Sequence, residues 1–366
     1  MLSQFLAITL YFAALLTIGL LSRRKNTTQN DFALGNRSLN FWVTAISAHA
    51  DDMSSWLFMA FPMAIFLTGP YKLWVAIGLM LGMFANWHYI APRLRRQTEV
   101  YDSATLSTFF ERRFGDSTGL IRVLSALMIL FFMTYYISAG LVATGRILES
   151  LLGIQYSIGI SLAISIVVAY VFVGGFVSVA WTDCAQGIFL LGAILSVPCL
   201  AFLRMDHASQ AMHSAYTQGA YAAFLPELSV SSALAVFSLS AGWGLGYLGQ
   251  PHILTKFMGI KDAAELRKSK YLGMTWQLLA LLSAAAVGFM GMVLFPQGLE
   301  RPELVFVEMA QMLFTPFVAT LILCGIFAAN MSTMDAQILV SATVLSEDFY
   351  KRLFHIRASP AQVLRM

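Results

Sequence analysis

Apolar stretches follow one another along the chain and are separated by short polar segments. Nine of these stretches approach or exceed the ~20 residues that a helix needs to cross the hydrocarbon core of a bilayer. They cover residues 3–22, 41–68, 73–92, 121–151, 155–175, 183–204, 231–250, 273–296 and 315–345. The pattern predicts an all-α polytopic membrane protein with nine spans.

The second stretch is interrupted by polar side chains. Two adjacent carboxylates, Asp51 and Asp52, lie there with His49 and three serines. An ionisable residue at mid-bilayer depth costs about 2.5–3.5 kcal/mol, so these side chains must face protein, water or an ion. Serine and aspartate also compete for backbone hydrogen bonds, which predicts a break in the helix. Many secondary transporters bind a coupling cation at such a break.

Composition supports the membrane assignment and narrows the function. The chain has 366 residues, of which 58% are hydrophobic and 11% charged, with a mean hydropathy of +0.71, which excludes an ordinary soluble domain. The three cysteines lie in apolar runs without paired spacing, so neither a disulfide framework nor a zinc site is indicated. No catalytic triad or metalloprotease motif is present, and we expect no enzyme activity.

The basic residues predict the topology. If the N-terminus is outside, all but four of the 23 lysines and arginines fall on the inner side. The exceptions are Lys72, Arg146, Arg204 and Arg301. Because inner loops are enriched in basic residues, we expect a multi-pass protein of the cytoplasmic (inner or plasma) membrane, in contact with its lipid, with the C-terminus inside. Because the basic residues are distributed according to the side of the membrane, they give no support for nucleic-acid binding.

The ninth stretch carries a second polar cluster. Ser332 and Thr333, with carbonyl oxygens of the second span, would offer the hard oxygen ligands that an alkali cation prefers. The alternative is that both hydroxyls bond back to their own helix. Asp335 lies two positions further on.

Aromatic residues mark a possible solute pocket. Trp243 and Tyr247 lie four positions apart, on one face of a glycine-rich segment. Close helix packing and an interfacial aromatic belt are the alternatives. In the fourth stretch, one of Tyr135 and Tyr136 can face a cavity, since successive helical residues point about 100° apart.

Two further segments have alternative interpretations. Asp183 begins the sixth stretch, where it would interact with a helix N-terminus or handle an ion. The segment 93–120 contains either a short amphipathic helix at the inner surface or a solvated basic loop.

Four segments together resemble the sodium:solute symporter family, most closely the sodium/proline symporters. They are residues 31–39, 52–56, 243–252 and 331–333. The resemblance implies a LeuT-type inverted-repeat fold in a single transporter domain over residues 1–366. It divides the chain into a leading helix and inner loop (1–40), a five-helix repeat (41–204), the first three helices of a second repeat (231–350) and a cytoplasmic tail (351–366).

The resemblance also implies a function, the symport of Na+ with a small amino acid, proline first, by alternating access. Pantothenate or a sugar is an alternative solute. Sodium would bind backbone carbonyls of Ala50 and Met53 and oxygens of Ala329, Ser332 and Thr333, supported by the Asp52 carboxylate. The residues that match the solute pocket are Ser54, Ser55, Trp56, Tyr136, Trp243 and Tyr247.

The chain departs from the family pattern in three ways. Ser55 stands where the proline carriers usually have glycine, and Ala336 stands where the best-known ones have cysteine. The last two helices of the second repeat are not in the sequence. An alternative is therefore an inactive truncated product, or a subunit that needs a second polypeptide.

Overall fold

The computed structural model describes residues 2–22, 28–205, 217, 223–224 and 229–354, and these form helices joined by short turns. The longer helices of the first half are α1 (Leu2–Leu21), α3 (Phe41–Met53), α4 (Ala60–Thr68), α5 (Leu73–Ala85), α8 (Leu120–Leu152) and α9 (Tyr156–Arg204). Those of the second half are α11 (Val230–Tyr247), α12 (Pro251–Gly259), α13 (Leu266–Leu294), α14 (Val305–Leu313) and α15 (Pro316–Val344). The short α-helices are α2 (Gln29–Leu34), α6 (Ala91–Val100) and α7 (Leu106–Phe114). The 3-10 helices are η1 (Gly35–Arg37), η2 (Ser55–Leu57), η3 (Pro70–Lys72), η5 (Ala263–Glu265) and η6 (Pro302–Leu304), and the π-helices are η4 (Asn86–Ile90) and η7 (Leu345–Phe354).

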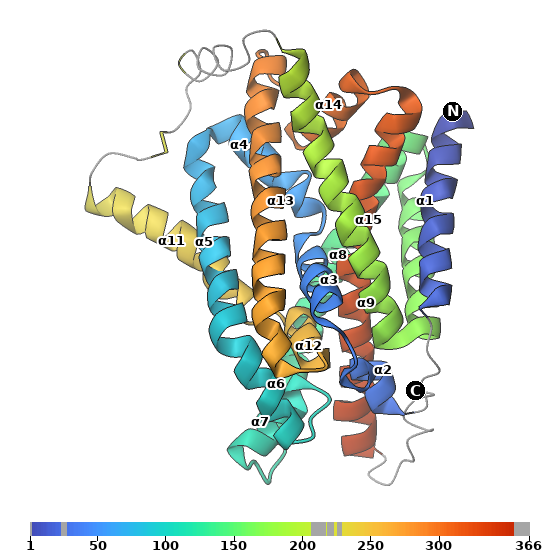
Figure 1. Cartoon of the computed structure of the whole chain (residues 1–366), viewed down its shortest axis with the longest axis vertical. Coiled ribbons are helices and arrows are strands. Elements are labelled where there is room, and N and C mark those ends of the chain that lie inside the picture. Colours follow the sequence, from blue (N-terminus) through green and yellow to red (C-terminus); the bar gives the residue numbers. More distant parts are fainter. Residues whose placement is uncertain (1, 23–27, 206–216, 218–222, 225–228, 355–366) are drawn as a thin grey trace.

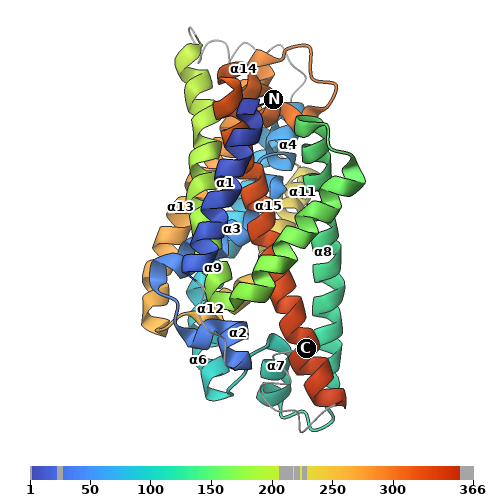
Figure 2. The same cartoon turned by 90° about the vertical axis from the view of Figure 1, so that its right-hand side faces the viewer.

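The long helices run along the long axis of the molecule (Figures 1 and 2). α1 packs against α9 and α15, and α13 packs against α3, α4 and α9. The short helices α6 and α7 lie at one end of the molecule, and α14 lies at the other (Figure 1). α11 is strongly tilted and lies against α5 (Figure 1).

The contact between α5 and α11 is made by backbone rather than by side chains. A Cβ atom on Gly78 would overlap the carbonyl oxygen of Ser240, and one on Gly82 would overlap that of Gly244. Small residues at a helix interface let two backbones approach closely. In the glycine-rich segment of α11, Gly244 therefore serves helix packing, whereas nothing lies within 4 Å of a Cβ atom placed on Gly242 or Gly246.

Among the described residues, six helical segments are long and apolar enough to cross a membrane. They are Leu2–Leu21, Pro70–Val100, Leu120–Glu149, Gly174–Arg204, Ala263–Leu294 and Pro316–Lys351. The other three predicted spans overlap helices that are shorter or broken: residues 41–68, 155–175 and 231–250. As complete spans these three remain predictions.

The fifth and sixth predicted spans meet in one 49-residue helix, α9, instead of being separated by a loop. Its axis is interrupted at Gly175, where φ is 62° and ψ is −167°. Glycine reaches this left-handed region without steric cost. The sixth helical segment thus begins at about residue 174 rather than at residue 183.

The predicted inner loop at 93–120 contains α6 and α7, so the amphipathic-helix interpretation is correct for this segment. The loop at 205–230 and the tail at 351–366 lie almost wholly outside the described residues.

Candidate functional site

The second predicted span is broken where its polar residues lie. α3 ends at Met53, and α4 begins only at Ala60. Between them Ser54 has φ 46° and ψ −165°, a backbone conformation that residues with a Cβ rarely adopt. The predicted break is confirmed, and it leaves the backbone around Ser54 and Ser55 free to bond elsewhere.

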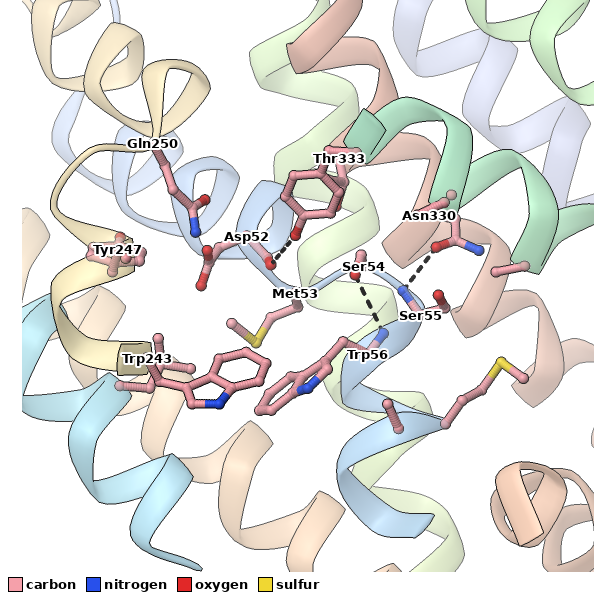
Figure 3. Close-up of a pocket in the computed structure, with 18 of the residues that line it drawn as sticks. Asp52, Met53, Ser54, Ser55, Trp56, Trp243, Tyr247, Gln250, Asn330 and Thr333 are labelled. Atoms are coloured by element: carbon pink, nitrogen blue, oxygen red, sulfur yellow. Dashed lines mark hydrogen bonds between the residues drawn. The ribbon is translucent and has the colours of Figure 1, made fainter. Parts of the chain in front are cut away.

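Asn330 of α15 holds the broken segment. Its Oδ1 accepts a hydrogen bond from the backbone N–H of Ser55 at 2.8 Å (Figure 3). Its Nδ2 donates to Thr144 Oγ1 of α8 at 3.2 Å. The side chain therefore joins the break to two other helices. Sequence reasoning did not assign Asn330 to the site, although an amide inside an apolar span was a usable signal.

Oxygen atoms of α3 and α15 meet near the break. Ser332 Oγ lies 3.2 Å from the carbonyl oxygen of Ala50 and 3.2 Å from that of Ala329. Thr333 Oγ1 donates to the Ala329 carbonyl at 2.9 Å. Both hydroxyls thus bond back to their own helix, as the alternative held, but Ser332 also reaches α3. Together these groups form a buried, all-oxygen set of the kind that alkali cations prefer.

Asp52 and Met53 form the end of α3, close to these oxygens. The Met53 side chain is buried, and its Sδ is 3.1 Å from Gln277 Nε2. The Asp52 carboxylate faces the side chain of Gln250, and the backbone carbonyl of Asp52 accepts a hydrogen bond from Tyr136 at 3.4 Å (Figure 3). Asp52 therefore lies at the broken end of α3, with its carboxylate directed towards Gln250.

A cavity of about 820 Å³ adjoins the break. The six residues that the resemblance assigned to the solute pocket all line it: Ser54, Ser55, Trp56, Tyr136, Trp243 and Tyr247. The indole rings of Trp56 and Trp243 lie 4.8 Å apart, centroid to centroid (Figure 3). The structure therefore brings residues from separate segments of the chain to one cavity.

The choice between the two neighbouring tyrosines of α8 is settled by exposure. Tyr136 lines the cavity, whereas the Tyr135 side chain is 66% exposed on the outer surface of the helix. Tyr136 is thus the member of the pair that can contact a bound solute.

Asp183 does not lie at the start of a helix, where the sequence predicted it. The interruption of α9 is at Gly175, and Asp183 lies about two helical turns beyond it, inside the continuing helix. The backbone N–H groups without a partner belong to the first turn of a helix, so a carboxylate this far along cannot cap them. The capping interpretation is therefore wrong, and the buried side chain must have another partner.

That partner is Lys256, which the topology argument assigns to an inner loop. Lys256 instead lies on α12, and its side chain is 2% exposed. Its Nζ is 2.6 Å from Asp183 Oδ2 and 3.0 Å from Asp51 Oδ2. Asp183 and Asp51 are therefore partners of one buried lysine. No local sequence signal pairs these residues, because they come from three distant segments.

One family model matches most of the chain. Residues 32–365 match the model of the sodium:solute symporter family. The chain belongs to this family. Family membership makes it a multi-pass transporter of the membrane, with Na+ as the coupling ion, and the oxygen set between α3 and α15 suits such an ion.

Two relatives come from Bacillus subtilis (strain 168). The osmoregulated proline transporter OpuE is 38% identical over 363 residues, which cover 98% of this chain and 73% of OpuE. The high-affinity proline transporter PutP is 40% identical over 354 residues, which cover 96% of this chain and 74% of PutP.

A solved structure has the same fold. It is the substrate-bound, outward-open state of a Na+-coupled sialic acid symporter, with a TM-score of 0.81 and 18% identity, covering 99% of this chain and 76% of that one. The similarity confirms the predicted all-α, LeuT-type fold class.

Proposed function

We propose that this symporter carries proline together with Na+ across the cytoplasmic membrane by alternating access. The observation that supports the solute is the 38–40% identity to two proline transporters over nearly the whole chain. The six expected pocket residues line one cavity, which is consistent with a single small solute bound beside the break.

The ion would bind between α3 and α15. The proposed ligands are backbone carbonyls of Ala50, Met53 and Ala329 with the hydroxyls of Ser332 and Thr333. In support, the Ala50 and Ala329 carbonyl oxygens each lie 3.2 Å from Ser332 Oγ, and the Ala329 oxygen lies 2.9 Å from Thr333 Oγ1. The nearby Asp52 carboxylate adds the negative charge that favours a bound cation.

The solute would bind on the other side of the break. The first residue of α4, Ala60, lines the cavity, and the positive end of a helix attracts a carboxylate group. The Trp56 and Trp243 rings offer apolar area to a pyrrolidine ring. Sodium would order the broken segment that both ligands share, so each would raise the affinity for the other.

The orientation belongs to the same proposal. With the N-terminus outside, the end of the molecule that carries α14 faces outwards, and α6 and α7 lie at the inner surface (Figure 1). Residues 41–204 and 231–350 would then be the two related halves that move against each other.

The test is uptake in a bacterial strain that lacks its own proline carrier. Labelled proline, pantothenate and sugars are supplied in sodium or in choline medium, and the amount of protein in the membrane is measured in parallel. We expect sodium to stimulate proline uptake at least tenfold. Uptake without sodium stimulation for every solute, with the protein present in the membrane, contradicts the proposal.

Two serines of α15 provide a matched pair of variants. Ser332→Ala removes a proposed sodium ligand and should raise the sodium concentration for half-maximal uptake at least tenfold. Ser341→Ala removes a hydroxyl that donates to the Gln337 carbonyl of its own helix at 2.8 Å. This control should change the sodium concentration for half-maximal uptake less than twofold. A similar response of the two variants would argue against the proposed ion site.

A further inference from the structure

We propose that Lys256 is a built-in cation of the protein core and a positioning residue for the sodium-binding end of α3. The inference rests on the proposed function for its link to sodium, but the arrangement of charges stands on its own. The topology argument expects Lys256 in a loop, whereas it lies buried at the meeting point of several helices.

Three carboxylates lie together at this meeting point. Asp51, Asp183 and Asp335 each offer an oxygen atom within 4.8 Å of the others, and all three side chains are fully buried. Lys256 pairs with the first two at 3.0 and 2.6 Å. Among the described residues, neither carboxylate oxygen of Asp335 has a hydrogen-bond partner.

Buried carboxylates without a counter-charge are costly, so such a cluster needs a cation. In this chain the cation is covalently attached. The ammonium group of Lys256 lies within contact distance of two carboxylates that belong to different helices, α3 and α9. It therefore holds α12 to both of them.

The cluster is adjacent in sequence to the proposed ion ligands. Asp51 lies between Ala50, whose carbonyl oxygen contacts Ser332, and Asp52 at the cavity. α12 begins immediately after Gln250, which faces Asp52 (Figure 3). By fixing Asp51, Lys256 fixes the backbone that presents the Ala50 oxygen.

The test compares Lys256→Met with Lys256→Arg, and with Lys261→Met as a control at an exposed lysine of the following segment. For Lys256→Met we expect the half-saturating sodium concentration to rise at least tenfold, while the half-saturating solute concentration at saturating sodium stays within threefold of the native value. Lys256→Arg should restore the sodium dependence to within threefold, and Lys261→Met should not alter it.

A purely structural lysine would lower the amount of protein without changing the sodium dependence of what remains. Native sodium dependence in Lys256→Met, or an arginine variant as impaired as the methionine variant, overturns the proposal.

The membrane level of the variants tests the charge arrangement without transport. If Lys256→Met does not accumulate, the double variant Lys256→Met with Asp183→Asn, which removes one charge of each sign, should accumulate to a higher level. Equal absence of both variants contradicts the proposal. A failure of the proposed transport function would appear instead as native protein that accumulates normally but shows no sodium-stimulated uptake.

Discussion

At the scale of single residues, two adjacent carboxylates have different surroundings. Asp52 lines the cavity and faces Gln250, whereas Asp51 is fully buried and paired with Lys256. A helix turns about 100° per residue, so neighbours in sequence face different partners. The two acids should therefore contribute to transport in different ways.

Asp52→Asn should raise the half-saturating sodium concentration at least tenfold. The substitution removes a negative charge that attracts a cation bound near the broken end of α3. Asp51→Asn should raise the half-saturating sodium concentration threefold or less, because an asparagine oxygen can still accept a hydrogen bond from Lys256. The half-saturating sodium concentration of each variant is measured from initial uptake rates at a series of sodium concentrations. Equal effects of the two variants would contradict different roles for Asp51 and Asp52.

The site illustrates which residues a sequence can place. Ser332, Thr333 and the break near Ser54 follow from local polarity within apolar spans. The roles of Lys256 and Asn330 do not, because each depends on partners in distant parts of the chain, the nearest of them 73 residues away. Local periodicity carries no information about such pairs.

At the scale of helices, α5 and α11 form a closely packed pair. Their backbones meet at Gly78 and Gly82, where a side chain would overlap a carbonyl oxygen of α11. α11 also carries Trp243 and Tyr247 of the cavity wall. A change in the spacing of the two helices should therefore alter the shape of the solute pocket.

Gly82→Ala should reduce maximal uptake at least fivefold. The added methyl group must push the helices apart, and overpacking of this kind typically costs about 1–3 kcal/mol. Gly192→Ala is the matched control, because nothing lies within 4 Å of the added atom and both substitutions raise helix propensity. Uptake per molecule in the membrane is the measurement, and equal activity of the two variants would refute the packing argument.

At the scale of the whole molecule, the cavity extends from the break towards the end that carries α14, and a charged network lies at the other end. The cavity lining extends to Met63 of α4 and Glu303 of η6. At the other end, Arg122 of α8 binds Asp348 Oδ1 of η7 at 2.7 Å and Glu111 of α7 at 3.1 Å. We expect this network to hold the proposed inner side of the molecule closed.

Arg122→Gln should shift the protein towards a conformation that is open at the inner side. Removing one partner of a buried ion pair leaves an uncompensated charge and typically costs about 3–5 kcal/mol. To measure the opening of the inner side, a single cysteine is introduced at Ala143, which lines the cavity. Its rate of labelling by an impermeant thiol reagent is then measured in inside-out vesicles. The three native cysteines are replaced first.

We expect labelling to accelerate at least fivefold in Arg122→Gln. Arg113→Gln, at an exposed arginine of α7, serves as the control and should leave the rate unchanged. Unchanged labelling in both variants would show that the network does not hold the inner side closed.

The backbone contact between α5 and α11 also has a consequence for sequence variation. Gly78 and Gly82 face α11 one helical turn apart, while Leu81 and Phe84 of the same helix are exposed. In a library that contains every single substitution of α5, Gly78 and Gly82 should tolerate no other residue, alanine included. The exposed positions should accept most apolar residues, so the helix contact could be read from variant frequencies alone.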